Sequence, residues 1–241
     1  MSMTLSLNWR VLGAALLASS IFAAPAMRAG SGVMPVRPDL PLVFEPNRGQ
    51  TNSSIQYLSR GGSHALLLRQ SEAVLVLRAK DNHTESVRMR FEGAASSRLE
   101  PETSLPGHSN YLIGNDRSQW RTNIPHFAKV RYRSIYPGID LIYYGNEGRL
   151  EYDFLVAAGA DPSQIRFRLD GAKALTLALN GDLVLKLEQG ETRHHKPVVY
   201  QEIAGARTVV PGRYILRGNH VSFKLGKYDR AKPLIIDPVL S

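Results

Sequence analysis

The sequence predicts an all-β protein, a β-sandwich of two packed antiparallel β subdomains preceded by a signal peptide. Three observations predict this class. Apolar and polar residues alternate along most of the chain after residue 26, turn residues recur at short spacing, and no segment of about 11 residues repeats its apolar side chains at the helical period. A chain of many short strands without helices buries its apolar residues by packing sheet on sheet. A single larger sandwich is the alternative arrangement.

The first 26 residues are expected to form a secretory signal peptide. Arg10 is their only charged residue, Val11–Ala24 is apolar and small, and Ala24–Ala26 supplies a cleavage site, so cleavage is expected after Ala26. The apolar run of roughly 14 residues is shorter than the about 20 residues of a membrane-spanning helix. An uncleaved anchor is the alternative. We therefore expect an exported protein, extracellular, at the cell surface or in the periplasm, without a transmembrane segment after signal removal.

Residues 27–41 are expected to form an extended leader, because three prolines interrupt a segment that has no apolar period. The first β subdomain is predicted over residues 42–158 and the second over residues 159–241, with the alternative that the two form one unit. The boundary follows the turn-forming residues Gly159–Pro162.

Short alternating segments predict the strands of the first subdomain. In Glu85–Gly93, for example, Val87 and Met89 alternate with charged residues, so one face is core and the other is solvent. The segment Ser96–Pro125 is less regular, because prolines and glycines interrupt it. The strands expected before the central hairpin are Leu42–Glu45, Ile55–Ser59, His64–Arg69, Ala73–Ala79, Glu85–Gly93, Asn110–Ile113 and Phe127–Ser134.

The segment Tyr136–Phe154 predicts a β-hairpin. Leu150, Tyr152 and Phe154 alternate with charged residues on one arm, the other arm shows the same alternation, and Gly145–Gly148 is the expected turn. In the second subdomain, Asn180-Gly181 is the strongest short hairpin signal. The strands expected there are Ile165–Asp170, Ala174–Leu179, Leu183–Glu188, Thr192–His195, Val198–Glu202, Thr208–Leu216, Val221–Leu225 and Leu234–Asp237.

Composition limits the chemistry. The chain has no cysteine, which excludes disulfides, thiol catalysis and cysteine-ligated zinc. Its net charge of +9 favours an anionic partner, such as an anionic glycan or another envelope component. Lys129, Arg131 and Arg133 fall on one face of a strand and are a candidate binding stripe. The alternative is that they form only the solvated face of the sheet, and no specific nucleic acid is expected.

Three acids on the hairpin are the candidate site for chemistry. Asp140, Glu151 and Asp153 share one face, and a two-residue turn at Asn146-Glu147 would place Asp140 opposite Asp153. Two carboxylates about 5 Å apart suit a retaining glycosidase or a calcium ion. The alternative, which we expect, is that these acids are salt-bridged by arginines such as Arg131 or Arg133.

Aromatic residues offer a related site. Trp120 and Tyr144 are expected at the surface, where their rings would stack on a sugar, or they pack in the core or an interface. His194 and His195 are adjacent on a strand and point to opposite faces, so they predict no metal site. No catalytic residue and no metal site is assigned, and calcium is the one cofactor that the acids would suit.

Ordered motifs along the chain resemble a known family. They are Phe44–Gln50, Leu105–Gly107, Gly114–Asp116, Trp120–Pro125, Tyr136–Asp140, Leu150–Phe154, Gly159–Pro162, Lys196–Gln201, Tyr228–Arg230 and Ile236–Val239. Together they resemble the domain of unknown function, DUF7948-like, that precedes SBBP-type β-propeller repeats in exported bacterial surface proteins. The resemblance implies an exported location and β-propeller or other repeats as partners, and it implies no established activity.

These observations predict a non-catalytic exported or cell-surface β-sandwich module of scaffold or adhesion type. The alternative is a carbohydrate-binding or carbohydrate-active protein that uses the Asp140/Asp153 face, with glycoside hydrolysis as the least unlikely activity.

Overall fold

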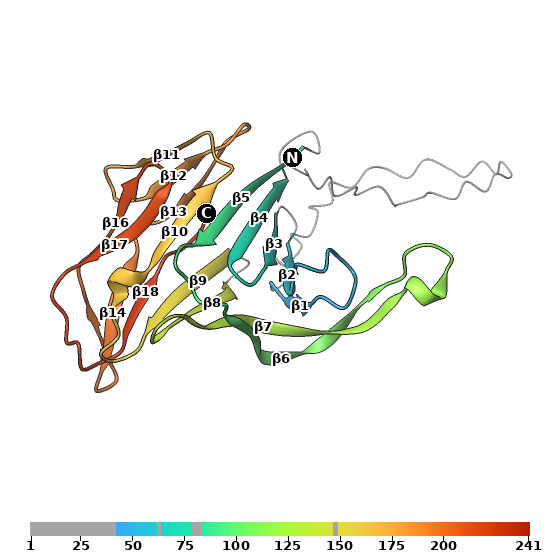
Figure 1. Ribbon diagram of the computed structural model, residues 1–241, viewed down its shortest axis with the longest axis horizontal. Coiled ribbons are helices and arrows are strands. Elements are labelled where there is room, and N and C mark those ends of the chain that lie inside the picture. Colours follow the sequence, from blue (N-terminus) through green and yellow to red (C-terminus); the bar gives the residue numbers. More distant parts are fainter. Residues whose placement is uncertain (1–41, 62–63, 79–82, 147–148) are drawn as a thin grey trace, which may run out of the picture. The chain divides into compact units, whose positions relative to one another are not determined.

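The computed structural model describes residues 42–61, 64–78, 83–146 and 149–241, all within one compact unit, Arg37–Ser241 (Figure 1). The expected signal peptide and leader, and the Glu147-Gly148 part of the expected turn, lie outside the described residues. The prediction of an all-β fold is confirmed, since the strands form one large and one small antiparallel sheet. Both segments on either side of residue 158 contribute strands to the large sheet.

The strands follow one another with short connections. The elements up to the central hairpin are β1 (Phe44–Pro46), β2 (Tyr57–Arg60), β3 (His64–Leu68), β4 (Glu72–Arg78), β5 (Thr84–Phe91), β6 (Arg98–Tyr111), the 3-10 turn η2 (Arg117–Gln119), β7 (Arg121–Tyr136), β8 (Ile139–Asn146) and β9 (Arg149–Val156). Those after it are η3 (Pro162–Gln164), β10 (Arg166–Asp170), β11 (Ala174–Leu177), β12 (Leu183–Lys186), β13 (Glu191–His194), β14 (Val198–Ile203), β15 (Ala206–Val209), β16 (Gly212–Arg217), β17 (His220–Leu225) and β18 (Leu234–Asp237).

The large sheet runs in the order β15-β14-β18-β9-β8-β7-β1-β2-β3-β4-β5-β10-β17-β16, and β6 pairs with β7. Seven strands separate β9 from β10 in this order, yet Phe154 of β9 stacks on Phe167 of β10 with ring centroids 6.3 Å apart. The sheet therefore curls until its two halves face each other. The core lies between these halves, where the alternate residues of each strand are buried.

Aromatic rings run continuously through this core. The contacts, given by centroid distance, are Phe91–Tyr132 5.4 Å, Tyr132–Tyr143 6.2 Å, Tyr143–Tyr152 5.5 Å, Tyr152–Phe154 6.0 Å, Phe154–Phe223 5.8 Å and Tyr214–Phe223 5.4 Å. All lie within the range of favourable edge-to-face and tilted ring pairs. The inward residues of the central hairpin, Tyr143, Tyr152 and Phe154, form the middle of this chain, so the predicted alternation of this hairpin is confirmed.

The small sheet, β11-β12-β13, adds Leu183 and Leu185 to the same core. The Glu85 carboxylate of β5 accepts hydrogen bonds from the backbone N–H groups of Glu188 and Gln189, at 2.7 and 2.9 Å. On the other side, the last residues of the chain form bridges with both β9 and β13. The small sheet is therefore bound to the large sheet through Glu85 of β5, and the C-terminal residues connect it to β9.

The prediction of an irregular segment over Ser96–Pro125 is wrong. Strands β6 and β7 extend as a long two-stranded arm, which the figure shows leaving the rest of the sheet (Figure 1). Pro101 and Pro106 are tolerated because β6 is an edge strand, where a missing N–H breaks no sheet ladder. Register shifts after Leu105 and Ser109 absorb the remaining irregularity.

Two smaller predictions also change. The segment Thr208–Leu216 divides into β15 and β16, with Pro211 between them. Gly145 belongs to β8 and pairs with Leu150, rather than forming part of the turn. Among the described residues, no helix has the length and apolarity needed to cross a membrane.

Strands β5 and β10 approach each other closely at Gly171, and this contact gives a test of their packing. A Cβ on Gly171 would lie 2.1 Å from the backbone oxygen of Ser86, whereas a Cβ on Gly190 meets nothing within 4 Å, and both glycines have positive φ, +101° and +111°. We expect Gly190→Ala to cost about 1 kcal/mol of unfolding free energy, from backbone strain alone. Gly171→Ala should cost about 2 kcal/mol more, because β5 and β10 must separate. Urea unfolding measures both, and equal losses would contradict the observed packing.

Candidate functional site

The outward face of the central hairpin carries the acids that the sequence singles out. Asp140 and Tyr144 project from β8, and Glu151 and Asp153 from β9, on the face opposite the aromatic core. Strand pairing continues this face across β18 and β14, which add Asp237 and Tyr200. The predicted residues therefore lie on one face, but their partners divide them into two groups.

Asp140 is an ion-paired structural residue. Its Oδ2 atom accepts hydrogen bonds from Arg131 and Arg133, at 3.1 and 3.2 Å, which confirms the expected salt bridges. Its Oδ1 atom accepts the backbone N–H of Ser134, at 2.8 Å. Ser134 has φ +46° and lies where the β7–β8 register shifts, so the Asp140 carboxylate holds a β-bulge in place.

The candidate basic stripe is largely paired with acids. Arg131 also binds Glu102 and Arg133 binds Glu100, both on β6, with N–O distances of 2.5 and 2.8 Å. These bonds lower the pKa of Glu100 and raise that of Arg131. Lys129 lies over the ring of Tyr144, 5.3 Å from its centroid. The arginines of the stripe therefore join β6, β7 and β8.

The expected pairing of Asp140 with Asp153 is wrong. Asn146 pairs with Arg149, so Asp153 lies opposite Ile142 and Asp140 lies opposite Leu155. The register differs because the turn begins one residue later than the turn assumed from the sequence. The two carboxylates consequently do not form the directly opposed pair of a retaining glycosidase.

Asp153 has an environment unlike that of Asp140. No arginine pairs with it among the described residues, so the salt bridge expected there is also wrong, and the Tyr144 hydroxyl donates to its Oδ1 at 3.1 Å. Burial, followed by the charge of nearby Asp237, raises the pKa of Asp153 to about 7. Burial also raises the pKa of Asp237. Two neighbouring half-buried carboxyls ionise less readily than isolated ones, because burial and the charge of the other carboxylate both disfavour the ionised form.

Glu151, Asp153 and Asp237 make up what we call the acidic cluster. Glu151 is buried and accepts a hydrogen bond from the Asn146 amide at 3.2 Å. Tyr144 and Tyr200 flank the cluster, and Arg207 lies over Tyr200, 4.4 Å from its ring centroid. Carboxyls with raised pKa values can hydrogen-bond a polar ligand such as a sugar, and the neighbouring tyrosine rings can stack on its ring. In the described part of the chain, no group of three or more His, Asp or Glu side chains is arranged to hold a metal ion.

Trp120 is separate from this face. It follows η2 at the far end of the β6–β7 arm, where its Nε1 donates to the Gly114 carbonyl at 3.1 Å (Figure 1). Arg117 lies over its ring at 5.4 Å. The sugar-stacking partnership of Trp120 with the hairpin acids is therefore not formed within this unit.

A buried network at the base of the arm was missed by sequence reasoning. Glu45 of β1 is 7% exposed and accepts from the hydroxyls of Ser109 and Tyr111, each at 2.5 Å. The Ser109 hydroxyl also lies 2.8 Å from Nε2 of His126. A serine protease triad places serine and acid on different histidine nitrogens, whereas here Ser109 and Glu45 both approach Nε2. The network therefore anchors the arm to β1, and the only sequence signal for it was an acid between two apolar strand residues.

His194 is likewise a structural residue. Its Nδ1 lies 2.8 Å from the Tyr152 hydroxyl, and its ring contacts the Tyr152 ring in the core. Burial, with a smaller effect from His195, lowers the pKa of His194 to about 3. A neutral, buried histidine of this kind keeps the Tyr152 hydroxyl hydrogen-bonded where no water reaches it.

The structure thus defines an all-β domain whose single large sheet curls on itself and carries polar clusters outside its core. The chain belongs to the family described as Domain of unknown function (DUF7948), which matches residues 44–239. This finding confirms the family part of the resemblance. Comparison with curated proteins and with solved structures gives no match.

Replacing Asp140 tests its structural role. We expect Asp140→Ala to lower the unfolding free energy by about 1–3 kcal/mol, because two arginines and the Ser134 N–H lose a charged acceptor. Chemical denaturation of the purified protein measures the loss. An unchanged midpoint would show that the bulge does not depend on this carboxylate.

Replacing Asp153 should raise the unfolding free energy, whereas replacing Asp140 should lower it. The pKa of Asp153, about 7 in the folded protein, lies above the ordinary value of 3.8, so the folded state holds a proton that the unfolded chain releases between these values. Stability is therefore lost as the pH rises through this window. Asp153→Asn should stabilise the protein on the order of 2–4 kcal/mol at pH 8 and have little effect near pH 4.

Urea unfolding of wild type and Asp153→Asn at both pH values provides the measurement. A stabilisation of equal size at pH 4 and pH 8 would show that the effect does not come from ionisation of this carboxyl.

Proposed function

We propose that the protein is a non-catalytic exported module of scaffold or adhesion type. One observation supports this function most directly: β15 is a free edge of the large sheet, and all four of its residues are exposed. Val209 on β15 is 73% exposed, and Val198 on the neighbouring strand is 49% exposed. An edge strand with unpaired backbone groups and apolar side chains is suited to pairing with a further β unit.

The other edges of the sheet are less suited to such pairing. Two prolines and two register shifts interrupt β6, and β16 carries two arginines without an ion pair among the described residues, Arg213 and Arg217. The single arginine of β15, Arg207, lies over Tyr200 and pairs with Glu202 at 3.7 Å. Prolines, bulges and charges are the features that keep sheet edges from pairing. Strand β15 is therefore the edge at which we place the partner.

The partner and location follow from the sequence. The expected signal peptide supports export, and the resemblance to modules that precede SBBP-type β-propeller repeats supports such repeats, or an envelope component, as the partner. A propeller or other β repeat presents strands of its own, which makes edge-to-edge addition at β15 chemically reasonable.

The second candidate is a carbohydrate-binding or carbohydrate-active protein. The acidic cluster favours it, because a carboxyl with a pKa of about 7 beside tyrosines resembles the general acid of a glycosidase. This candidate now uses Asp153 with Asp237 and Tyr144, since Asp140 is held by arginines.

The test of the first function uses the full chain with a C-terminal tag. Cell fractionation should recover it outside the cytoplasm with its first 26 residues removed, as mass spectrometry would show. In co-sedimentation with detergent-free envelope fragments, Val209→Lys should reduce the bound fraction several-fold, since a charge on an edge strand opposes further pairing.

Leu179→Lys is the matched control, because Leu179 is fully exposed on a turn of the small sheet and should bind as wild type. Equal binding by Val209→Lys and wild type would remove β15 as the contact. Release of reducing sugar from a polysaccharide, abolished in Asp153→Asn, would favour the second candidate over the first.

A further inference from the structure

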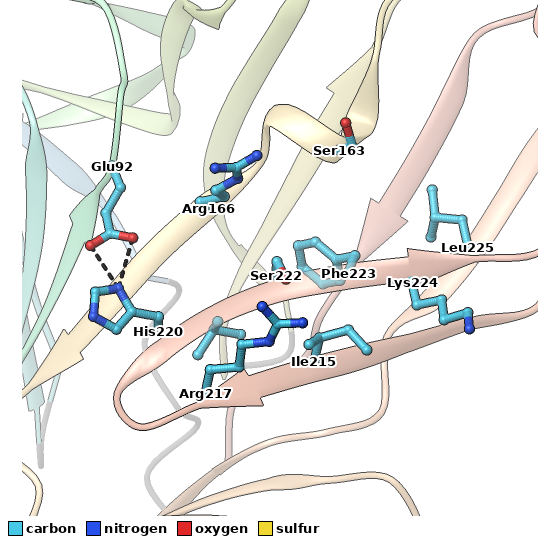
Figure 2. A pocket seen from close by; sticks show the side chains of 11 residues that line it. Glu92, Ser163, Arg166, Ile215, Arg217, His220, Ser222, Phe223, Lys224 and Leu225 are labelled. Atoms are coloured by element: carbon cyan, nitrogen blue, oxygen red, sulfur yellow. Dashed lines mark hydrogen bonds and ion pairs between the residues drawn. The ribbon is translucent and has the colours of Figure 1, made fainter.

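We propose that an open groove over β10, β17 and β16 binds an acidic polysaccharide. The groove has a volume of about 800 Å³, and its lining includes Arg166, Arg217 and Lys224, one from each strand (Figure 2). The inference rests on the proposed adhesion function, because it names a chemical class of ligand for an exported, non-catalytic module.

The charges come from the regular alternation of three neighbouring strands. Phe167, Tyr214 and Val221 point into the core and are almost completely buried. On each strand, the residues that alternate with these buried ones point outward. Strand pairing places two of the outward cations next to residues of β17, Arg166 beside Ser222 and Arg217 beside His220. Residues on one face recur about every 7 Å along a strand, so cations from the three neighbouring strands share this face.

These cations are not bound to an acid among the described residues, although the charge of Arg166 contributes, after the hydrogen bonds of Ser163, to the lowered pKa of Asp161. In the part of the chain that the structure describes, Arg166, Arg217 and Lys224 form no ion pair, and all three are exposed. Lys224 is moreover directly opposite Arg213, another exposed and unpaired cation, on β16. Like charges in directly opposed positions repel each other, so an anion bound between them relieves an unfavourable contact.

One carboxylate, that of Glu92, lines the groove, and it is bound to His220, which lines the groove as well. Both Glu92 oxygens lie 2.9 Å from Nδ1 of His220, as the dashed lines in Figure 2 show. The hydroxyls of Ser163 and Ser222 also line the groove and are suited to hydrogen-bonding a ligand hydroxyl. The groove thus combines three exposed cations with two serine hydroxyls and one Glu92–His220 pair, so cations outnumber the single carboxylate.

The contrast with the Lys129, Arg131 and Arg133 stripe supports the choice of this face. There, Arg131 and Arg133 bind three acids from two neighbouring strands. A cation that already has a buried or half-buried partner gains little from a second anion, whereas one without a partner gains its full interaction.

A polysaccharide fits the groove better than a nucleic acid. Single-stranded nucleic acid is held by exposed aromatic rings, and the lining ring, Phe223, packs instead against Phe154, Phe167 and Tyr214. The open, solvent-exposed shape also favours a chain that passes along the sheet over a small anion that would need enclosure.

The experiment measures binding of the mature protein to polygalacturonate, with dextran as the neutral polysaccharide and a thymidine oligonucleotide as the other anion. We expect binding to polygalacturonate that falls steeply between 50 and 500 mM NaCl, because salt screens exposed charges. The double variant Arg217→Gln, Lys224→Gln should weaken it about tenfold or more, since a groove with an excess of positive charge concentrates an anionic ligand.

The matched control is Arg48→Gln, Arg149→Gln, which removes two exposed cations outside the groove and should bind as wild type. Equal weakening by both double variants would mean that net charge alone attracts the polymer and would overturn the site. Unchanged binding by the groove variant, or no binding by wild type, would also overturn it. Tighter binding of the oligonucleotide would overturn the ligand class.

These outcomes are separable from failure of the proposed function. Absence of polygalacturonate binding by the wild-type protein, together with sedimentation of that protein on envelope fragments, would refute the groove and leave the contact at β15. Equal melting temperatures of the three proteins would show that the groove substitutions act on binding rather than on folding.

Discussion

The contact of Phe154 with Phe167 brings together two strands that seven others separate in the large sheet. An open sheet of this many strands would leave one apolar face in water, and curling buries that face against itself. The chain of aromatic rings from Phe91 to Tyr214 fills the resulting interior, and the small sheet closes part of it with Leu183 and Leu185. Every outward-facing cluster is positioned by this curl, because strand alternation then decides which side chains remain outside.

On the outside, neighbouring strands give similar residues opposite properties. Asp140 and Asp153 lie on the same face of one hairpin. Strand β7 brings arginines to Asp140, whereas β18 brings another acid, Asp237, to Asp153. One carboxylate therefore stabilises a bulge, and the other is half-buried with a raised pKa. The same residue type thus serves structure at one position and remains available for ligand binding at the other.

The excess of positive charge is distributed just as unevenly. Arginines beside β6 are paired with Glu100 and Glu102, whereas β16 and β17 place Arg213 against Lys224 with no acid between them. Strands β10, β17 and β16 therefore share a group of exposed cations without ion pairs to other described residues, and the acidic cluster lies on β9 and β18. Two regions of opposite charge and a free edge strand are the features on which the proposed scaffold or adhesion function depends.

Alternation along the chain was enough to predict the all-β class and the inward residues of the central hairpin, because strand periodicity is a local property. Only the end of β6 and the second half of β7 were predicted, and the long arm that they form was not, since prolines are permitted in a strand only once its edge position is known. The sequence was compatible with more than one register for the β8–β9 hairpin. In the structure Asn146 pairs with Arg149, and this register separates Asp140 from Asp153. The partners of each charge, from Asp237 beside Asp153 to Lys224 opposite Arg213, depend on which strands become neighbours. The sequence by itself determined which face of each strand is polar, and only the tertiary structure decided which polar residues meet, because strands distant in the chain pair through the curl of the sheet.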